Sequence, residues 1–181
     1  MALPRHILTA LVEDKPGVLN RVSGLFRRRG FNIASLAVGH SETPRLSRMT
    51  IVVEGGEGVR VQAARQLRKV VGVMEVKDIT GSEIVARELA LIKLRALAKD
   101  RNDIINVIGI FRADIVDVDI DTMIIQATGD ADKIEALHSM LLPFGVLEMM
   151  RTGEVAMVRG AAGRLGDGVE KAVVYEDIGG V

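Results

Sequence analysis

The 181-residue sequence contains no cysteine and no tryptophan, and aromatic residues make up only 3% of it. Without cysteine, disulfide bonds, thiolate nucleophiles and cysteine metal ligands are all excluded. Few aromatic rings also argue against RNA recognition, because sheets that read RNA stack the bases on exposed rings. The strands expected over residues 6–13, 31–39 and 46–53 contain one ring, that of Phe31. We therefore expect no nucleic-acid partner.

Long apolar runs and targeting segments are missing as well. No stretch approaches the roughly 20 apolar residues that a membrane-spanning helix needs. The N-terminal segment MALPRHILTALVED is too polar for a secretory signal. We expect a cytoplasmic protein that does not bind membranes. The hydrophobic content of 48% is sufficient for a packed core.

The sequence shows no cluster of catalytic or metal-binding residues. Its three histidines lie far apart, without a spacing that would chelate a metal on one element. The glycine-rich residues 55–58 lack the Lys-Ser/Thr pair of a phosphate-binding loop. Residues 117–121 (DVDID) lack the glycine and glutamate of a calcium loop. We interpret them as a hairpin turn with Val118 and Ile120 pointing inward, and expect no catalytic site and no metal site.

Hydrophobic periodicity indicates the same order of elements twice along the chain. In the first half it predicts strands over 6–13, 31–39, 46–55 and 72–80, with helices over 18–29 and 59–70. The second half predicts strands over 84–97, 114–120, 122–129 and 145–150, with helices over 103–112 and 132–142. The phrase Val-x-Gly-x-Phe-Arg at residues 22–27 recurs at 107–112. An internal duplication is the simplest explanation.

We therefore predict an α+β protein of two ferredoxin-like βαββαβ domains, residues 4–80 and 82–159. Each has an antiparallel sheet with two helices on one face. The shared helix glycines, Gly24 and Gly109, suggest close packing of helix backbone against the sheet. Domains of this size are marginal alone, so we expect a second copy to cover a bare face or edge, giving a homodimer. Residues 160–181 are rich in glycine and are expected to form a flexible tail or to order on a partner.

One turn suggests ligand binding. The segment EDKPGVL (13–19) leads a strand into a helix, whose first N–H groups attract a small carboxylate. Gly17 lets a ligand approach the backbone, the Asn32 amide can donate and accept, and Asp14 can pair with an ammonium group. The spacing fits equally well a turn in which Asp14 caps the helix and Gly17 only bends the chain.

This turn and two further phrases, LFRRRGFNIASLAV (25–38) and LSRMTIVV (46–53), carry a family resemblance. Over residues 1–159 the chain resembles the small regulatory subunit of acetohydroxyacid synthase, also called acetolactate synthase. Its first domain looks like an ACT domain. The tail after Gly160 has no counterpart that we can place.

The resemblance implies a non-catalytic subunit that activates a large catalytic subunit, which alone holds thiamine diphosphate, Mg²⁺ and FAD. It implies feedback inhibition by valine, or by leucine or isoleucine, bound between the ACT domains of two subunits. By position, the effector site falls on Asp14, Gly17 and Asn32, with Val18, Leu19 and Ile33 beside them. Asp14 stands where other members can carry asparagine, so the preferred amino acid stays open.

Other functional classes remain to be distinguished. An ACT-type module that binds amino acids, or only oligomerises, and acts on another enzyme is the main alternative. A transcriptional regulator should carry a helix-turn-helix unit, and none is visible. A stand-alone enzyme should present a convergent acid, base or nucleophile. Titration with branched-chain amino acids separates an effector-binding protein, which gives a heat of binding, from a pure oligomerisation module.

Overall fold

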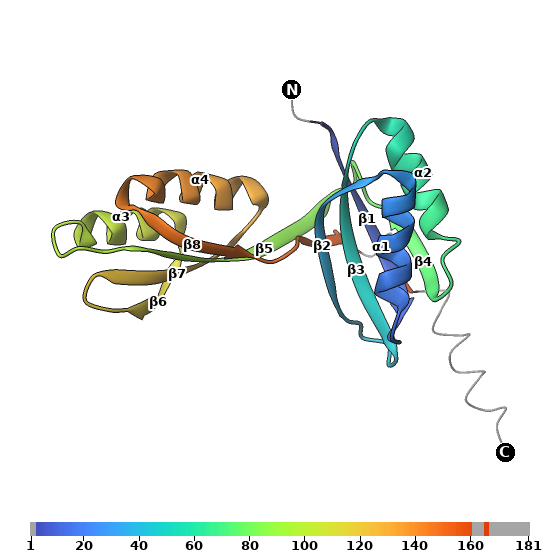
Figure 1. The fold of residues 1–181 in the computed structure, drawn as a ribbon, viewed down its shortest axis with the longest axis horizontal. Coiled ribbons are helices and arrows are strands. Elements are labelled where there is room, and N and C mark those ends of the chain that lie inside the picture. The colour runs from blue at the N-terminus through green and yellow to red at the C-terminus, as the bar shows by residue number, and fades with distance from the viewer. Residues whose placement is uncertain (1–2, 161–164, 167–181) are drawn as a thin grey trace, which may run out of the picture. The chain divides into compact units, whose positions relative to one another are not determined.

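A computed structural model describes residues 3–160 and 165–166 of the chain (Figure 1). The chain divides into two compact units, which we describe separately. The first unit comprises the chain up to Val85 and from Val155 onward, and the second comprises Ala86–Glu154. The division near residue 85 lies close to the expected domain boundary. The end of the expected second domain differs, because residues 155–159 belong to the first unit.

The first unit has the βαββαβ order that the periodicity predicts. Its elements are β1 (Arg5–Glu13), α1 (Val18–Arg29), β2 (Asn32–His40), β3 (Leu46–Glu54), α2 (Glu57–Leu67) and β4 (Val73–Asp78). The antiparallel sheet has the order β2-β3-β1-β4, and α1 and α2 cover one of its faces (Figure 1). This confirms the ferredoxin-like fold of the first half.

The core of the first unit lies between this sheet and its two helices. Helix α1 contributes one apolar stripe, Val18, Val22, Leu25 and Phe26, spaced as the amphipathic pattern predicts. The helix ends where Gly30 adopts a left-handed conformation with φ of 66°. The Gly30 N–H then bonds to the helix carbonyls, which closes the last turn.

The second unit repeats this arrangement. Its elements are β5 (Ile84–Arg95), α3 (Arg101–Phe111), β6 (Asp114–Val118), β7 (Thr122–Gly129), α4 (Ala131–Leu141), the 3₁₀ turn η1 (Leu142–Phe144) and β8 (Val146–Arg151). The strand order is β6-β7-β5-β8, again with both helices on one face (Figure 1). A separate core forms between them. The predicted duplication of the fold is therefore present.

Two local expectations are wrong. The glycines shared by α1 and α3 do not pack against a sheet. A Cβ atom at Gly109 would meet nothing within 4 Å, and one at Gly24 would meet only the guanidinium of Arg28. In the hairpin between β6 and β7, Ile120 is 87% exposed and Val118 also faces solvent. The reason is that β6 is the edge strand of its sheet, so its end has no neighbour to cover it.

The face of the first sheet opposite the helices is partly covered by the chain itself. Strand β9 (Val155–Val158) pairs with β5, and the Ala156 N–H approaches the Thr50 hydroxyl at 3.4 Å. Further along, Leu165 is buried with Leu11 and Leu46. Residues 161–164 and 167–181 of the expected flexible tail lie outside the described residues. Within the tail, Leu165 and Gly166 are packed on the first unit.

Candidate functional site

The turn from β1 into α1 is built around Gly17. Gly17 is the N-terminal cap of α1, with φ of 85° and ψ of −9°. This left-handed conformation is easily reached only by glycine, because a Cβ atom would crowd the backbone. The turn is anchored on its other side, where the Asp14 N–H donates to the Arg45 carbonyl at 2.8 Å. The sequence-predicted helix start is therefore present, and Gly17 is needed for its shape.

No side chain caps the start of α1, so Asp14 does not act as the helix cap. At the start of α4, by contrast, the Asp130 carboxylate accepts a hydrogen bond from the Lys133 N–H. The N–H groups of a helix start need acceptors, from a side chain, water or a ligand. The start of α1 shares the lack of a side-chain cap with α2 and α3, and its Val18 N–H approaches the Lys15 carbonyl at 3.4 Å, so the remaining first-turn N–H groups can donate to an external partner.

Charge also distinguishes the start of α1 from the other helix starts in the described part of the chain. The first turn of α1 contains no acidic residue, whereas those of α2, α3 and α4 contain Glu57, Asp103 and Asp132. A carboxylate at these positions already neutralises the positive end of the helix dipole and repels a second anion. Of these four starts, α1 is thus the one best suited to an anionic ligand.

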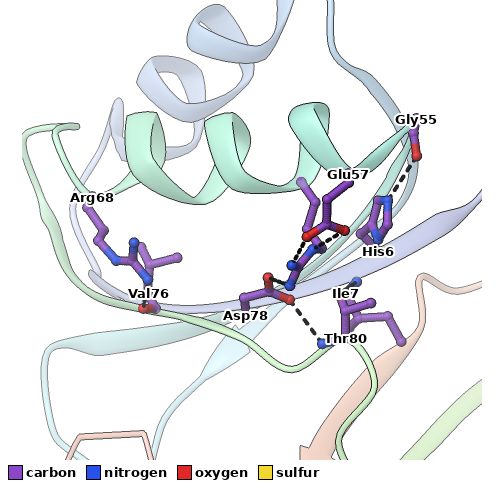
Figure 2. Close-up of polar contacts among 9 residues, drawn as sticks. His6, Ile7, Gly55, Glu57, Arg68, Val76, Asp78 and Thr80 are labelled. Carbon is purple, nitrogen blue, oxygen red and sulfur yellow. Dashed lines mark hydrogen bonds and ion pairs between the residues drawn. The ribbon is translucent and has the colours of Figure 1, made fainter.

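The start of α2 illustrates the opposite case. Arg60 pairs there with both Glu57 and Asp78, and His6 donates through Nε2 to the Gly55 carbonyl at 2.8 Å (Figure 2). The hydrogen bond from Arg60 lowers the pKa of Glu57 and raises that of Arg60. These charges satisfy one another, which is typical of a structural cluster.

Arg21 adds positive charge to the α1 start, and the sequence reasoning missed it. Its Nε donates to the Val71 carbonyl at 2.9 Å, which holds the guanidinium in place. The Nη1 atom then lies 3.5 Å from the position a Cβ atom on Gly17 would occupy. A ligand carboxylate over Gly17 would therefore meet a fixed cation. The signal was available, since residues 17 and 21 are one helical turn apart.

The two apolar residues after Gly17 have different roles. Val18 is 2% exposed and belongs to the core, so only its backbone can reach a ligand. Leu19 is 46% exposed beside the turn. An aliphatic ligand side chain can therefore contact Leu19 but not Val18.

Asp14 lies in the turn with its carboxylate exposed. Its Oδ2 atom is 3.1 Å from Nδ1 of His40, the last residue of β2. His40 was not among the predicted site residues. A ligand ammonium at Asp14 would have to share or replace this contact.

Asn32 and Ile33 do not join the other predicted site residues within one chain. Asn32 begins β2, opposite Glu54, whereas His40 ends it, opposite Ser47 and near the turn. An extended strand rises about 3.3 Å per residue, so Asn32 and His40 are about 26 Å apart. The Asn32 amide nitrogen donates to the Glu54 carboxylate at 2.6 Å. Ile33 is half-buried against the core.

Among residues 3–160 and 165–166, no three histidine, aspartate or glutamate side chains gather as potential metal ligands. No helix in the same part of the chain is long and apolar enough to span a membrane.

Comparison with known proteins gives one consistent result. A family model described as the AHAS small subunit-like ACT domain matches residues 8–75, and one described as the small subunit of acetolactate synthase matches 87–160. A probable acetolactate synthase small subunit of Archaeoglobus fulgidus is 53% identical over 156 residues, 86% of this chain and 98% of the relative. The acetolactate synthase small subunit of Bacillus subtilis is 46% identical over 157 residues, covering 86% and 91%.

A solved structure agrees with the sequence relatives. The crystal structure of the small subunit of acetolactate synthase from Thermotoga maritima superimposes with a TM-score of 0.81 at 42% identity. The match covers 87% of this chain and 99% of that one. Both units are therefore shared with this relative.

Proposed function

The chain belongs to the family of acetolactate synthase small subunits, and we propose that its first unit binds a branched-chain amino acid that regulates a catalytic subunit. In the absence of effector, this chain activates the catalytic subunit. When valine or a related amino acid binds, the activity falls. The thiamine diphosphate, Mg²⁺ and FAD of the reaction belong to the catalytic subunit in this proposal.

The observation that carries the proposal is the combination of features at the start of α1. Gly17 is left-handed, the helix has no side-chain cap and no acid in its first turn, and Arg21 lies over it. An α-carboxylate placed there accepts from the helix N–H groups and from the guanidinium. The exposed side chain of Leu19 then faces the aliphatic part of the ligand.

The ammonium group of the ligand needs acceptors. Asp14 supplies one carboxylate in the turn. Asn32 supplies a second acceptor, because its amide nitrogen already donates to Glu54 and its amide oxygen is the atom left to accept. Since Asn32 lies at the far end of β2 from the turn, it can serve only the site of another copy.

An antiparallel homodimer supplies this second copy. Strand β2 is an edge strand, so two copies can pair their β2 strands around a two-fold axis. Antiparallel pairing over the whole strand puts position 32 of one copy beside position 40 of the other. Each turn at Gly17 then faces the start of β2 of the partner subunit, and two complete sites form.

Such a site can regulate only through a difference in affinity between two arrangements of the subunits. We propose that the effector favours a dimer packing that no longer supports the active form of the catalytic subunit. A ligand clamped between two copies is suited to this, because its contacts change whenever the copies shift relative to each other.

Reconstitution with a cognate catalytic subunit tests the proposal. The wild-type chain should stimulate pyruvate condensation, and valine should reverse the stimulation. Gly17→Asp places a carboxylate where that of the ligand would lie, so valine sensitivity should fall by about tenfold or more while stimulation persists. Gly17→Asn is the matched control, since asparagine has nearly the size of aspartate and a similar tolerance of the left-handed conformation, without the charge. Stimulation that stays insensitive to valine in the wild type would overturn the effector role, and no stimulation would favour an ACT module acting on another enzyme.

A further inference from the structure

The open face of the first sheet carries a row of three side chains across strands β3, β1 and β4. Leu11 lies opposite Arg48 on one side and opposite Glu75 on the other. Residues directly opposite each other in an antiparallel sheet point to the same face. The row therefore places a cation, an apolar side chain and an anion in sequence.

One peptide group of the same chain lies across this row. Arg48 donates through Nη2 to the Leu165 carbonyl at 2.9 Å, and the Gly166 N–H donates to Glu75 Oε2 at 2.6 Å. The carbonyl and the N–H belong to the same peptide bond, so the negative end of its dipole faces the cation and the positive end faces the anion. Hydrogen bonds to charged groups of this kind are stronger than neutral ones.

The side chain of Leu165 completes the contact. It is 5% exposed and packs with Leu11 and Leu46. Gly166 has φ of 106°, and a Cβ atom there would lie 3.6 Å from Leu11. The row thus fits an aliphatic residue followed by glycine.

The two charged side chains of the row, Arg48 and Glu75, each have a second charged partner. Glu42 accepts from Nε of Arg48 at 3.1 Å, and Lys77 lies 3.3 Å from Glu75. Because each charge has a second partner, neither has to reorganise when the peptide group binds.

We propose that this row is a peptide-binding site whose occupant is the chain's own Leu165–Gly166 segment. The segment lies beyond residue 160, where the family match ends. The chain therefore carries both the row, on strands of its first unit, and the segment that binds to it.

The site also bears on the proposed effector turn, and this second step rests on the proposed function. Leu46 lies opposite Glu13, and the neighbouring Arg45 carbonyl accepts the Asp14 N–H that anchors the turn. Leu165 packs on Leu46 and on Leu11 of β1, the strand that leads into the turn. Docking of the segment therefore stabilises the end of β1 and the start of β3, which hold the turn of Asp14 and Gly17 in place.

Trypsin cleavage after Arg164 tests the docking in the full chain, because the bond joins Arg164 to the docked Leu165. Cleavage follows the fraction of molecules in which the segment is undocked. Arg48→Met removes the donor to the Leu165 carbonyl, so cleavage after Arg164, followed by mass spectrometry, should accelerate about tenfold or more. Glu75→Gln should accelerate it less, since the amide oxygen of glutamine still accepts. Arg65→Met, an exposed arginine on α2, is the matched control and should change nothing.

Circular dichroism shows whether Arg48→Met folds. If it does not, Glu75→Gln is the variant that tests the docking. Rates equal to wild type in a folded Arg48→Met protein, or in Glu75→Gln if Arg48→Met does not fold, would overturn the docking site. The result does not depend on valine.

Valine titration of full-length variants tests separately whether docking stabilises the turn. Leu165→Asp puts a carboxylate among the buried apolar side chains of Leu11 and Leu46 and should undock the segment, and valine should then bind about three- to tenfold more weakly. Leu165→Met keeps the volume and should retain wild-type affinity. Unchanged valine affinity in Leu165→Asp would overturn the proposed stabilisation of the turn but not the docking site. Failure of the wild type to bind valine would instead overturn the proposed effector site.

Discussion

The two units share one topology, but their first helices begin in different ways. Helix α1 starts at a left-handed glycine, with no acid in its first turn and with Arg21 over it. The 85-residue repeat puts Asn102 in α3 at the position of Gly17, and the first turn of α3 contains Asp103. Arg101 instead fastens the α3 start, donating to the Ala96 and Asp119 carbonyls at 3.0 and 2.7 Å. The fold is therefore common to both units, whereas the first helix starts at a left-handed glycine with no acid in its first turn only in the first of the two.

This difference teaches that topology does not confer binding in a duplicated protein. What matters is the charge at the helix start, because neither first helix has a side-chain cap. In the second unit Asp103 places a negative charge in the first turn of α3, which repels an anion. In the first unit the first turn of α1 contains no acid, which favours an anion.

The largest expected effect is on the free energy of unfolding of each unit when the large apolar residue of its first helix is removed. Phe26 is 1% exposed and meets Phe31 edge-on, with ring centroids 5.9 Å apart, whereas its repeat counterpart Phe111 is half-buried. Phe26→Ala should destabilise the first unit by about 3–5 kcal/mol, and Phe111→Ala the second by roughly 1–2 kcal/mol. Hydrogen exchange followed separately in β1 and β5 measures both. Equal losses would show that the two helices are held alike.

The next prediction concerns Arg21, which distinguishes the two helix starts. Arg21→Met should weaken valine binding by about tenfold, because one charged donor to the ligand carboxylate is lost. Arg27→Met, an exposed arginine on the same helix, is the control. Isothermal titration measures the affinities. Identical affinities for wild type and Arg21→Met would remove Arg21 from the site.

The smallest effect concerns the helix glycines that the two units share. Gly109→Ala should stabilise the second unit by about 0.5–1 kcal/mol, because alanine favours the helix and its Cβ atom has open space. Gly24→Ala should gain less, since its Cβ atom would lie 3.3 Å from the Arg28 guanidinium. Chemical unfolding measures the gain. A loss of stability at position 109 would indicate that another chain packs on α3 there.

Local signals in the sequence predicted much of the candidate site. The stripe of α1, its end at Gly30 and the turn at Gly17 all follow from side-chain periodicity and from the conformations that glycine alone adopts easily. The same signals failed at Gly109 and Ile120, because they do not reveal which face of an element has a neighbour. The grouping of Asn32 with Gly17 stays a prediction for a site between two copies, since within one chain β2 carries Asn32 to the far end of the sheet.

By itself the sequence determined the duplicated βαββαβ fold, the family and the turn at Gly17. These depend on periodicity, motif phrases and backbone preference, which act over a few residues. The tertiary structure decided that Arg21 reaches Gly17, that Asp14 meets His40, and that Leu165 lies across the row from Arg48 to Glu75. The contact of Asp14 with His40 and those of the Leu165–Gly166 peptide group with Arg48 and Glu75 join residues far apart in the chain. Strand register and packing determine these contacts, and a local sequence pattern predicts neither.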